Sequence, residues 1–396
     1  MALSLLGLEL AARVLRKLQG SGKEAGESRL YTEYDPLLGW RKRAGARATY
    51  RRREYTVEVA INSHGLRDPE RGHEARPGTF RLLALGDSFV EAYGVPLEMT
   101  VTQVLEAGLR REGCAAEVIN GGTNGYSTDQ EYLFYGSEGI KYAPRIVVLF
   151  FHYNDIVYNE RQEYFGAPKP ALEIGGGHLR VHRYPVREPP ARTAPHETQD
   201  DDGEGGSALL AWVRDRFWYG APRGYNALAR LGFWKPMPQV PVRLELRVYQ
   251  RSRVPDIEAA WEKTAAILAA LARETDTHGA RFLVVGVPSR LEVDEKSWEL
   301  TQALYRVDDS VWDRRQVMRR LAEIGRAASF PVLDVTERLR QGYRGFGARP
   351  YYTYDGHWTP RGHALVAAEV LGFLGARGWL AGCQRAQALP LSNLQP

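Results

Sequence analysis

The chain has 396 residues, more than the ~100–200 residues of a usual domain, so we expect one large domain with appended or inserted segments. With 44% hydrophobic and 26% charged residues, its composition is that of a globular protein and excludes a disordered chain. The formal net charge is only +5, and Lys and Arg are scattered along the chain, so nucleic acid is not expected as a partner.

Residues 1–30 are expected to form an amphipathic helix followed by a linker. Leu3, Leu6, Leu10 and Val14 recur at helical spacing, and residues 21–30 are polar and glycine-rich. The apolar stretch is too short to span a bilayer. Three placements remain open: the helix docks on the domain, lies on a membrane surface in peripheral contact with lipid, or is the stump of a longer anchor. The last two favour the cell envelope or a membrane-associated location, and the first leaves a cytoplasmic one open.

Residues 31–80 are expected to be a β-containing extension. Alternation of Tyr55, Val57, Val59 and Ile61 predicts a strand or two that lead into the core. Basic residues cluster at positions 41–43 and 51–53 of this extension. The favoured interpretation is a solvated strand face, and the alternative is contact with anionic lipid or polysaccharide.

Cysteine is rare in this chain. Cys114 and Cys383 are far apart in the sequence and have no metal-ligand spacing. We therefore expect neither a disulfide framework nor a thiolate zinc site.

Apolar runs that alternate with helical patterns predict an α/β core in two halves, residues 81–160 and 257–380, followed by a tail at 381–396. Because the runs are apolar throughout, they indicate parallel strands buried on both faces of a sheet. The expected strands are residues 82–85, 118–119, 146–151, 282–287 and 332–335. The expected helices are residues 102–111, 128–139, 257–275, 311–328 and 360–374.

Residues 161–256 interrupt this rhythm and are expected to be an insertion or a lid. Residues 160–206 are rich in Pro, Gly and charge and show no periodicity, which is typical of a functional loop. Residues 207–235 carry aromatic residues at roughly helical spacing. We interpret this stripe as packing onto the core, with a lid that faces substrate as the alternative.

Polar residues follow the first three core strands, where the carboxyl ends of parallel strands form ligand sites. Ser88 stands on the turn after the first strand, where neighbouring N–H groups can hold an oxyanion; a plain serine cap is the alternative. Gly125 belongs to a glycine-rich loop after the second strand, which allows close approach of the backbone. Asn154 follows the third strand, and its amide can donate a hydrogen bond to a developing negative charge.

Asp355 and His357 precede the last helix, which begins at the Thr359-Pro360 signal. A serine hydroxyl needs a base to remove its proton, and a nearby carboxylate fixes the tautomer of a histidine base. We therefore assign His357 as the base and Asp355 as its partner. His363 is the competing base, although it falls inside the expected helix.

In chain order, Gly86-Asp87-Ser88-Phe89, Gly125, Asn154 and the Asp355/His357 pair resemble the four sequence blocks of the SGNH (GDSL-type) hydrolase superfamily. The resemblance implies a flavodoxin-like three-layer α/β/α sandwich of about five parallel strands. It also implies that Ser88 is the nucleophile, that Ser88, Gly125 and Asn154 form the oxyanion hole, and that His357 is the base with Asp355 as its partner.

Two departures from the family pattern bear on function. His152 replaces the glycine of the third block, and we expect its side chain to narrow the pocket. The last block reads Asp-x-His-Trp and resembles the alginate O-acetylation proteins, which share the SGNH fold; this leaves the direction of the reaction open.

The leading hypothesis is a serine esterase that hydrolyses a small acyl ester, such as an O-acetyl or short-chain ester of a small molecule or glycan. The alternative is an O-acyltransferase that uses the same residues to acylate a polysaccharide or secondary metabolite. A catalytically silent carbohydrate-binding module and a flavodoxin-like nucleotide or flavin binder are the weaker hypotheses. No metal or organic cofactor is expected.

Overall fold

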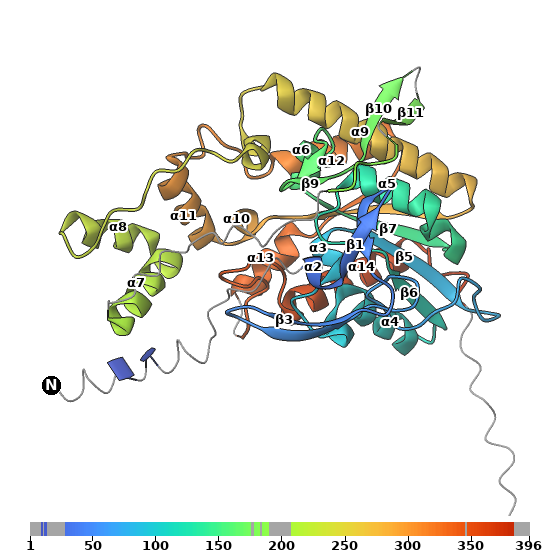
Figure 1. Ribbon diagram of the computed structural model, residues 1–396, viewed down its shortest axis with the longest axis horizontal. Coiled ribbons are helices and arrows are strands. Elements are labelled where there is room, and N and C mark those ends of the chain that lie inside the picture. Colours follow the sequence, from blue (N-terminus) through green and yellow to red (C-terminus); the bar gives the residue numbers. More distant parts are fainter. Residues whose placement is uncertain are drawn as a thin grey trace, which may run out of the picture.

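The computed structural model describes residues 9–10, 12–13, 28–175, 178–182, 184–189, 207–344 and 347–383. Its centre is a sheet of five parallel strands in the order β13-β12-β7-β5-β6 (Figure 1). The strands are β5 (Phe80–Gly86), β6 (Ala116–Asn120), β7 (Ile146–His152), β12 (Arg281–Val287) and β13 (Val332–Asp334). The flavodoxin-like order and the predicted number of core strands are confirmed.

Helices cover both faces of this sheet, which makes a three-layer sandwich. Alternate residues of each strand enter opposite cores: Leu83 packs in one core, and Leu82 packs in the other. One face is covered by α5 (Thr128–Ser137), α9 (Pro255–Thr277) and α12 (Gln316–Ala327). The other is covered by α4 (Val101–Arg111), α13 (Thr336–Arg344) and α14 (Pro360–Ala376).

The N-terminal extension forms two antiparallel hairpins. A short helix, α2 (Ser28–Tyr31), begins within the expected linker and leads into the strands. The strands are β1 (Thr32–Asp35), β2 (Gly39–Lys42), β3 (Arg47–Arg51) and β4 (Thr56–Ala60). Their inward-facing side chains, Tyr50, Val57 and Val59 among them, pack with Tyr93 of the sandwich, so the extension is seated on the core.

The insertion contains more regular structure than expected. Residues 163–182 form two small hairpins, β8 (Glu163–Tyr164) with β9 (Ala167–Pro168) and β10 (Ala171–Gly175) with β11 (His178–His182). The absence of periodicity misled the prediction here because strands of two to five residues are too short to show one. Residues 190–206 of the expected loop lie outside the described residues.

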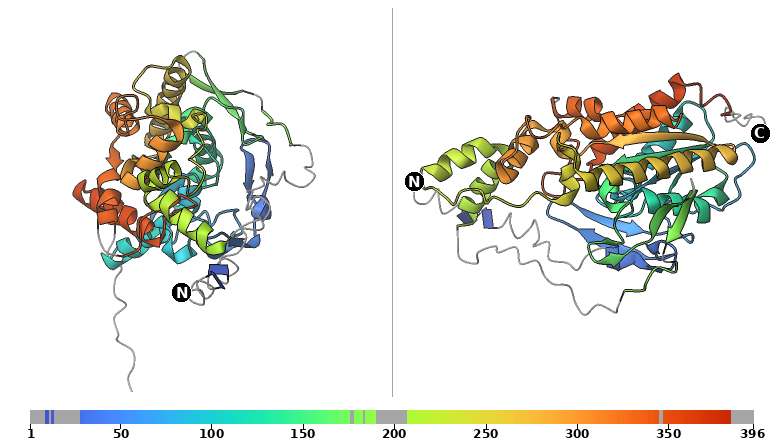
Figure 2. Two further views of the ribbon diagram at one scale, coloured as in Figure 1. Left: turned by 90° about the vertical axis from the view of Figure 1, so that its left-hand side faces the viewer. Right: turned by 90° about the horizontal axis from the view of Figure 1, so that it is seen from above.

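The aromatic stripe folds into α7 (Ala208–Gly220) and α8 (Pro222–Arg230), which project from one end of the molecule (Figures 1 and 2). Trp234 packs on Phe217 and Tyr225, at centroid distances of 5.7 and 5.1 Å. The stripe therefore packs largely on itself and on α11, and not on the main core as we expected. The remaining helices are α3 (Ser88–Glu91), α6 (Asn154–Tyr158), α10 (Arg290–Val293) and α11 (Glu295–Tyr305), with 3₁₀ turns η1 (Leu97–Met99), η2 (Gly139–Tyr142) and η3 (Leu244–Tyr249).

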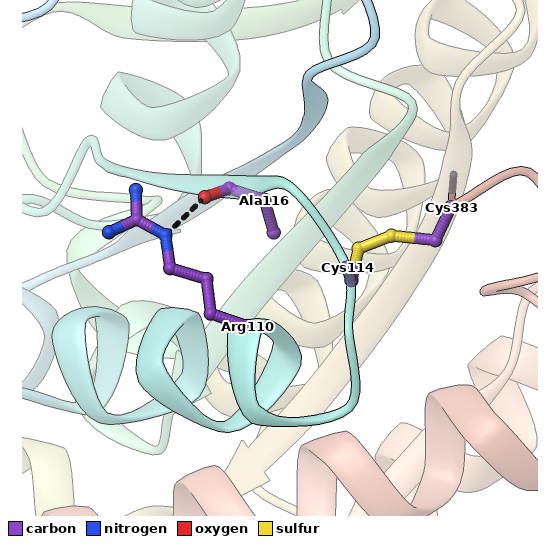
Figure 3. The surroundings of a disulfide bond; sticks show 4 residues. All are labelled: Arg110, Cys114, Ala116 and Cys383. Atoms are coloured by element: carbon purple, nitrogen blue, oxygen red, sulfur yellow. Dashed lines mark hydrogen bonds between the residues drawn. A yellow bond between two sulfur atoms is a disulfide. The ribbon is translucent and has the colours of Figure 1, made fainter. Parts of the chain in front are cut away.

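Cys114 and Cys383 form a disulfide (Figure 3), which the sequence analysis did not anticipate. Their Cα atoms are 5.3 Å apart although 269 positions separate them in the sequence. The reason is tertiary: α14 packs against α4, so the residues that follow these two helices meet. Sequence analysis excluded a disulfide framework, and this one cross-link corrects that exclusion.

We expect the Cys114→Ser variant to be less stable to unfolding by about 2–5 kcal/mol, because the cross-link restricts the unfolded chain over a very long loop. Thermal or urea unfolding of wild type under oxidising and reducing conditions measures the difference. The reduced wild type should match the variant. Equal stability of oxidised and reduced wild type would contradict the prediction.

Most of the predicted N-terminal helix lies outside the described residues. Residues 9–10 and 12–13 are helical, and the Glu9 carboxylate accepts hydrogen bonds from Ser207 Oγ and the Ala208 and Leu209 N–H groups. Within the described ranges, no helix is both long and apolar enough to cross a bilayer.

Candidate active site

Ser88 lies at the first position of α3, separated from β5 only by Asp87. The turn is tight: a Cβ at Gly86 would overlap the Val90 side chain, so only glycine fits there. Asp87 caps the helix, because its side chain accepts a hydrogen bond from the Phe89 N–H at 2.9 Å. Ser88 is thus presented at the carboxyl edge of the sheet on a fixed backbone.

Ser88, His357 and Asp355 form one hydrogen-bonded chain. Ser88 Oγ lies 2.7 Å from His357 Nε2, and His357 Nδ1 is hydrogen-bonded to Asp355 Oδ1. Because the carboxylate only accepts, Nδ1 carries the proton and leaves Nε2 free to accept from the serine hydroxyl. This is the arrangement that activates a serine nucleophile.

The charges of this pair stabilise each other. Burial alone would lower the pKa of His357, but the neighbouring Asp355 carboxylate outweighs burial and raises it. Burial would likewise raise the pKa of Asp355, but the charge and hydrogen bonds of His357 and the Tyr55 hydroxyl lower it to about 2. Asp355 is therefore ionised over the whole range in which His357 titrates.

The turn between β3 and β4 holds the loop that carries Asp355. The Glu54 carboxylate accepts hydrogen bonds from the backbone N–H groups of residues 353, 354 and 355, at 2.7, 2.7 and 3.1 Å. Tyr55 Oη donates to Asp355 Oδ2 at 2.8 Å, and the Arg53 guanidinium lies 3.7 Å from the centre of the Tyr354 ring. Sequence analysis missed Glu54 and Tyr55, because nothing local links them to a loop 300 positions away.

The glycine-rich loop is held by two buried charged residues that sequence analysis did not select. Glu91 accepts hydrogen bonds from the Asn124 N–H and from Tyr31 Oη, both at 2.6 Å. Lys42 Nζ donates to the Gly122 carbonyl and, at 2.7 Å, to Thr123 Oγ1, and burial lowers its pKa to about 8. Lys42 is thus no part of a solvated strand face, contrary to our interpretation of the basic cluster.

Gly125 itself requires glycine. Its φ is +79°, and a Cβ there would lie 2.6 Å from the Tyr164 ring. Tyr164 belongs to the first small hairpin of the insertion, so the insertion packs directly on this loop. No hydrogen bond joins Gly125 to Ser88 within the described part of the chain.

His152 orients Asn154. Burial lowers the pKa of His152 to about 3, so its ring is neutral, and Nδ1 lies 2.8 Å from Asn154 Oδ1. Nδ1 must then donate to the amide oxygen, and among the described residues Nδ2 of Asn154 has no acceptor. The histidine ring packs on Phe89, which packs on His357, at 4.7 and 4.9 Å. His152 therefore contacts Asn154 and Phe89, and its expected effect of narrowing the pocket stays a prediction.

Buried carboxyl groups lie behind these residues. Burial raises the pKa of Asp87 to about 6 and raises the pKa of Glu131 and Asp155 well above its usual range. The carboxylate that is hydrogen-bonded to His357 Nδ1 is that of Asp355.

His363 is not placed to act as the base. It lies buried inside α14, its ring meets Trp358 at 5.4 Å, and burial lowers its pKa to about 3. Ser88 Oγ is hydrogen-bonded to His357 instead.

One group of side chains in the described structure has the composition of a metal site. His64, His73 and Glu138 have potential ligand atoms within 4.8 Å of one another. His73 Nε2 and Lys141 Nζ already contact the two Glu138 oxygens, each at 2.7 Å. A cation would have to displace both contacts, so we assign no metal-binding role to these three residues.

A groove of about 440 Å³ borders the loop that carries Asp355. One side is formed by α7 and the other by the start of α11 and the segment that precedes Asp355. Neither Ser88 nor His357 lines it. Its lining includes Phe217, Tyr219, Lys296, Arg349, Thr353 and Tyr354. It offers aromatic and cationic side chains next to the candidate active site.

Comparison with known proteins defines the class to which this sandwich is similar. Residues 248–389 match the family model of the SGNH hydrolase-like domain, acetyltransferase AlgX, a range that includes Asp355 and His357. The resemblance drawn from the sequence blocks is thus confirmed in this part of the chain. Sequence comparison with curated proteins finds no match.

Among solved structures, the chain is similar to a lipase/acylhydrolase from Enterococcus faecalis, with 12% identity, coverage of 78% of this chain and 100% of that one, and a TM-score of 0.37. It is also similar to a catalytic mutant of Axe2, an acetylxylan esterase from Geobacillus stearothermophilus, with 13% identity, coverage of 75% and 94%, and a TM-score of 0.39. A putative lipolytic protein of the G-D-S-L family from Desulfitobacterium hafniense has 10% identity, coverage of 74% and 98%, and a TM-score of 0.35. Values this low carry no inference on activity.

Proposed function

We propose that this protein is a serine esterase that hydrolyses a small acyl ester through an acyl-enzyme on Ser88. The observation that carries the proposal is the hydrogen-bonded chain from Ser88 Oγ through His357 to Asp355. A hydroxyl that donates to a histidine base, which is itself oriented by an ionised carboxylate, is the arrangement that acyl transfer requires.

In the proposed reaction, Ser88 Oγ attacks the acyl carbonyl while His357 Nε2 takes its proton. The N–H groups of Ser88 and Gly125 and the Asn154 amide stabilise the oxyanion that forms. Collapse expels the alcohol, which receives the proton from His357. Water, deprotonated by His357, then attacks the acyl-enzyme. Collapse releases the acid, and Ser88 Oγ takes its proton back from His357.

The match to an acetyltransferase domain supports a second candidate, transfer of the acyl group to a hydroxyl of a polysaccharide or secondary metabolite. The two functions differ only in whether water or an acceptor hydroxyl attacks the acyl-enzyme. The groove with Tyr219 and Tyr354 would offer aromatic faces on which an acceptor could stack. The disulfide favours an oxidising compartment, which agrees with action at the cell envelope.

The test of this function is turnover of p-nitrophenyl esters from acetyl to octanoyl by the full chain, with Ser88→Ala as control. We expect hydrolysis by wild type only, with the acyl group trapped on Ser88 and visible in the intact mass. A sugar that competes with water for the acyl group would favour transfer. Absence of both turnover and trapped acyl-enzyme would contradict either function.

Asn154→Ala should lower kcat by about 10²–10³-fold with little change in KM, because one donor to the oxyanion is lost only in the transition state. His152→Phe keeps the ring packing on Phe89 but removes the donor to Asn154 Oδ1, so a smaller loss of kcat is expected. Steady-state kinetics on the best ester measures both. A change in KM alone would argue against an oxyanion role for Asn154.

A further inference from the structure

The α7–α8 arm, defined as residues 207–243, exposes large apolar side chains. Leu231 and Phe233 are 73% and 71% exposed, and Leu210 and Trp212 are 68% and 50% exposed. Single exposed apolar residues are common, but four on one projecting arm are not. Leu10, which is 65% exposed, adjoins the arm because its neighbour Glu9 caps α7.

The same arm is strongly basic. Its sequence holds a single acidic residue, Asp215, which pairs with Arg53 of the extension at 3.2 Å and with Arg214 of the arm at 3.7 Å. The basic excess of the arm equals that of the whole chain, which has 53 basic and 48 acidic residues, so the remainder is balanced. The basic residues of the arm are Arg214, Arg216, Arg223, Arg230, Lys235 and Arg243.

We propose that the α7–α8 arm binds the surface of an anionic lipid bilayer. Exposed Leu, Phe and Trp side chains enter the boundary between headgroups and acyl chains, and Arg and Lys beside them attract anionic headgroups. Arg230 and Lys235 flank Leu231 and Phe233 in the sequence, and within the described structure neither forms a salt bridge. Their charges are thus available next to the apolar side chains.

The positive charge of the α7–α8 arm favours an anionic bilayer over a second copy of the chain as its partner. Two arms brought together would place like charges against each other, which disfavours self-association. An anionic polysaccharide would use the Arg, Lys and Trp side chains but has no need of Leu231 and Phe233. A bilayer uses both kinds of side chain.

The base of the arm contacts the loop that carries Asp355. The Tyr219 ring packs on Tyr354 at a centroid distance of 4.9 Å, next to Asp355 in the sequence. A bound bilayer would therefore hold the groove beside the membrane surface. The proposal depends on the surface of the arm and not on the esterase function.

The test is flotation of the full chain with vesicles of phosphatidylcholine, alone or with an equal part of phosphatidylglycerol. We expect binding to the anionic vesicles and at least about tenfold weaker binding to phosphatidylcholine alone. Leu231→Ser/Phe233→Ser should weaken anionic-vesicle binding by tenfold or more, since each apolar side chain contributes through burial. Arg230→Gln/Lys235→Gln should weaken it by about thirtyfold.

Ile174→Ser is the matched control, because Ile174 is 52% exposed on β10, which lies away from α7 and α8 (Figure 1), and it should bind as wild type does. Thermal unfolding shows that each variant is folded. The proposal is overturned if wild type does not float with anionic vesicles, or if the serine pair binds unchanged, which would indicate a polyanion site. A dimer in sedimentation velocity that the serine pair dissociates would also overturn it.

Discussion

Replacing His357 with alanine is expected to lower kcat by about 10⁶-fold, the scale seen when a triad base is removed. The serine hydroxyl remains but has no group at 2.7 Å to take its proton. Because the two residues act as one unit, Ser88→Ala should cost about as much, and the double variant should cost no more than either single variant. Burst and steady-state kinetics on the best p-nitrophenyl ester give the three values.

His363→Ala is the matched control for this variant. His363 is the other histidine of the same segment, and it is buried against Trp358. Its loss should reduce stability and leave kcat of the folded enzyme within a few-fold of wild type. A large loss of kcat in a folded His363→Ala, or additive losses in the Ser88/His357 double variant, would reject the assignment of the base.

The sheet and the three residues Ser88, Asp355 and His357 could be predicted because each rests on a local signal. Uninterrupted apolar runs mark strands buried on both faces, and the residues that follow them reach the same edge of a parallel sheet. Thr359-Pro360 marks the start of the last helix, which leaves His357 in the loop before it. These signals need no knowledge of the tertiary structure.

The supports of the site could not be predicted, because they join segments that are distant in sequence. Glu54 holds the backbone of the Asp355 loop, and Glu91 and Lys42 hold the glycine-rich loop. Charged residues are usually exposed, so the sequence favoured a solvated face for Lys42. The disulfide was missed for the same reason, since only the packing of α14 on α4 brings its cysteines together.

Together these contacts indicate what the N-terminal extension contributes. Tyr55 and Glu54 come from its second hairpin, and Lys42 comes from its first. The extension therefore forms hydrogen bonds to both loops that flank Ser88, so its removal should disorder the candidate active site.

Asp355→Asn is expected to lower kcat by about 10⁴-fold and to move the pH dependence. An asparagine amide of similar shape can donate as well as accept, so it no longer fixes the His357 tautomer that leaves Nε2 free, which is the physical source of the loss. It also removes the negative charge that raises the pKa of His357.

The direction of the shift in pH dependence follows from the role of the base. His357 accepts a proton only when neutral, so kcat/KM falls as the pH drops through its pKa, which in wild type lies above the ordinary value of 6.5. In Asp355→Asn the pKa of His357 falls, so the acidic limb of kcat/KM should move to lower pH. The maximal value of kcat/KM, reached above that pKa, should also be lower than in wild type. A pH series on a soluble ester measures both effects.

Tyr55→Phe provides the control for this series. It removes one hydrogen bond to Asp355 Oδ2 and keeps the carboxylate, so the acidic limb should move little and the rate should fall far less than in Asp355→Asn. A variant that merely misplaced the loop would lose rate without moving the limb. Two results together would contradict the assignment: an acidic limb of kcat/KM in Asp355→Asn at the same pH as in wild type, and a loss of kcat of less than about tenfold. His357 would then be oriented by a group other than Asp355.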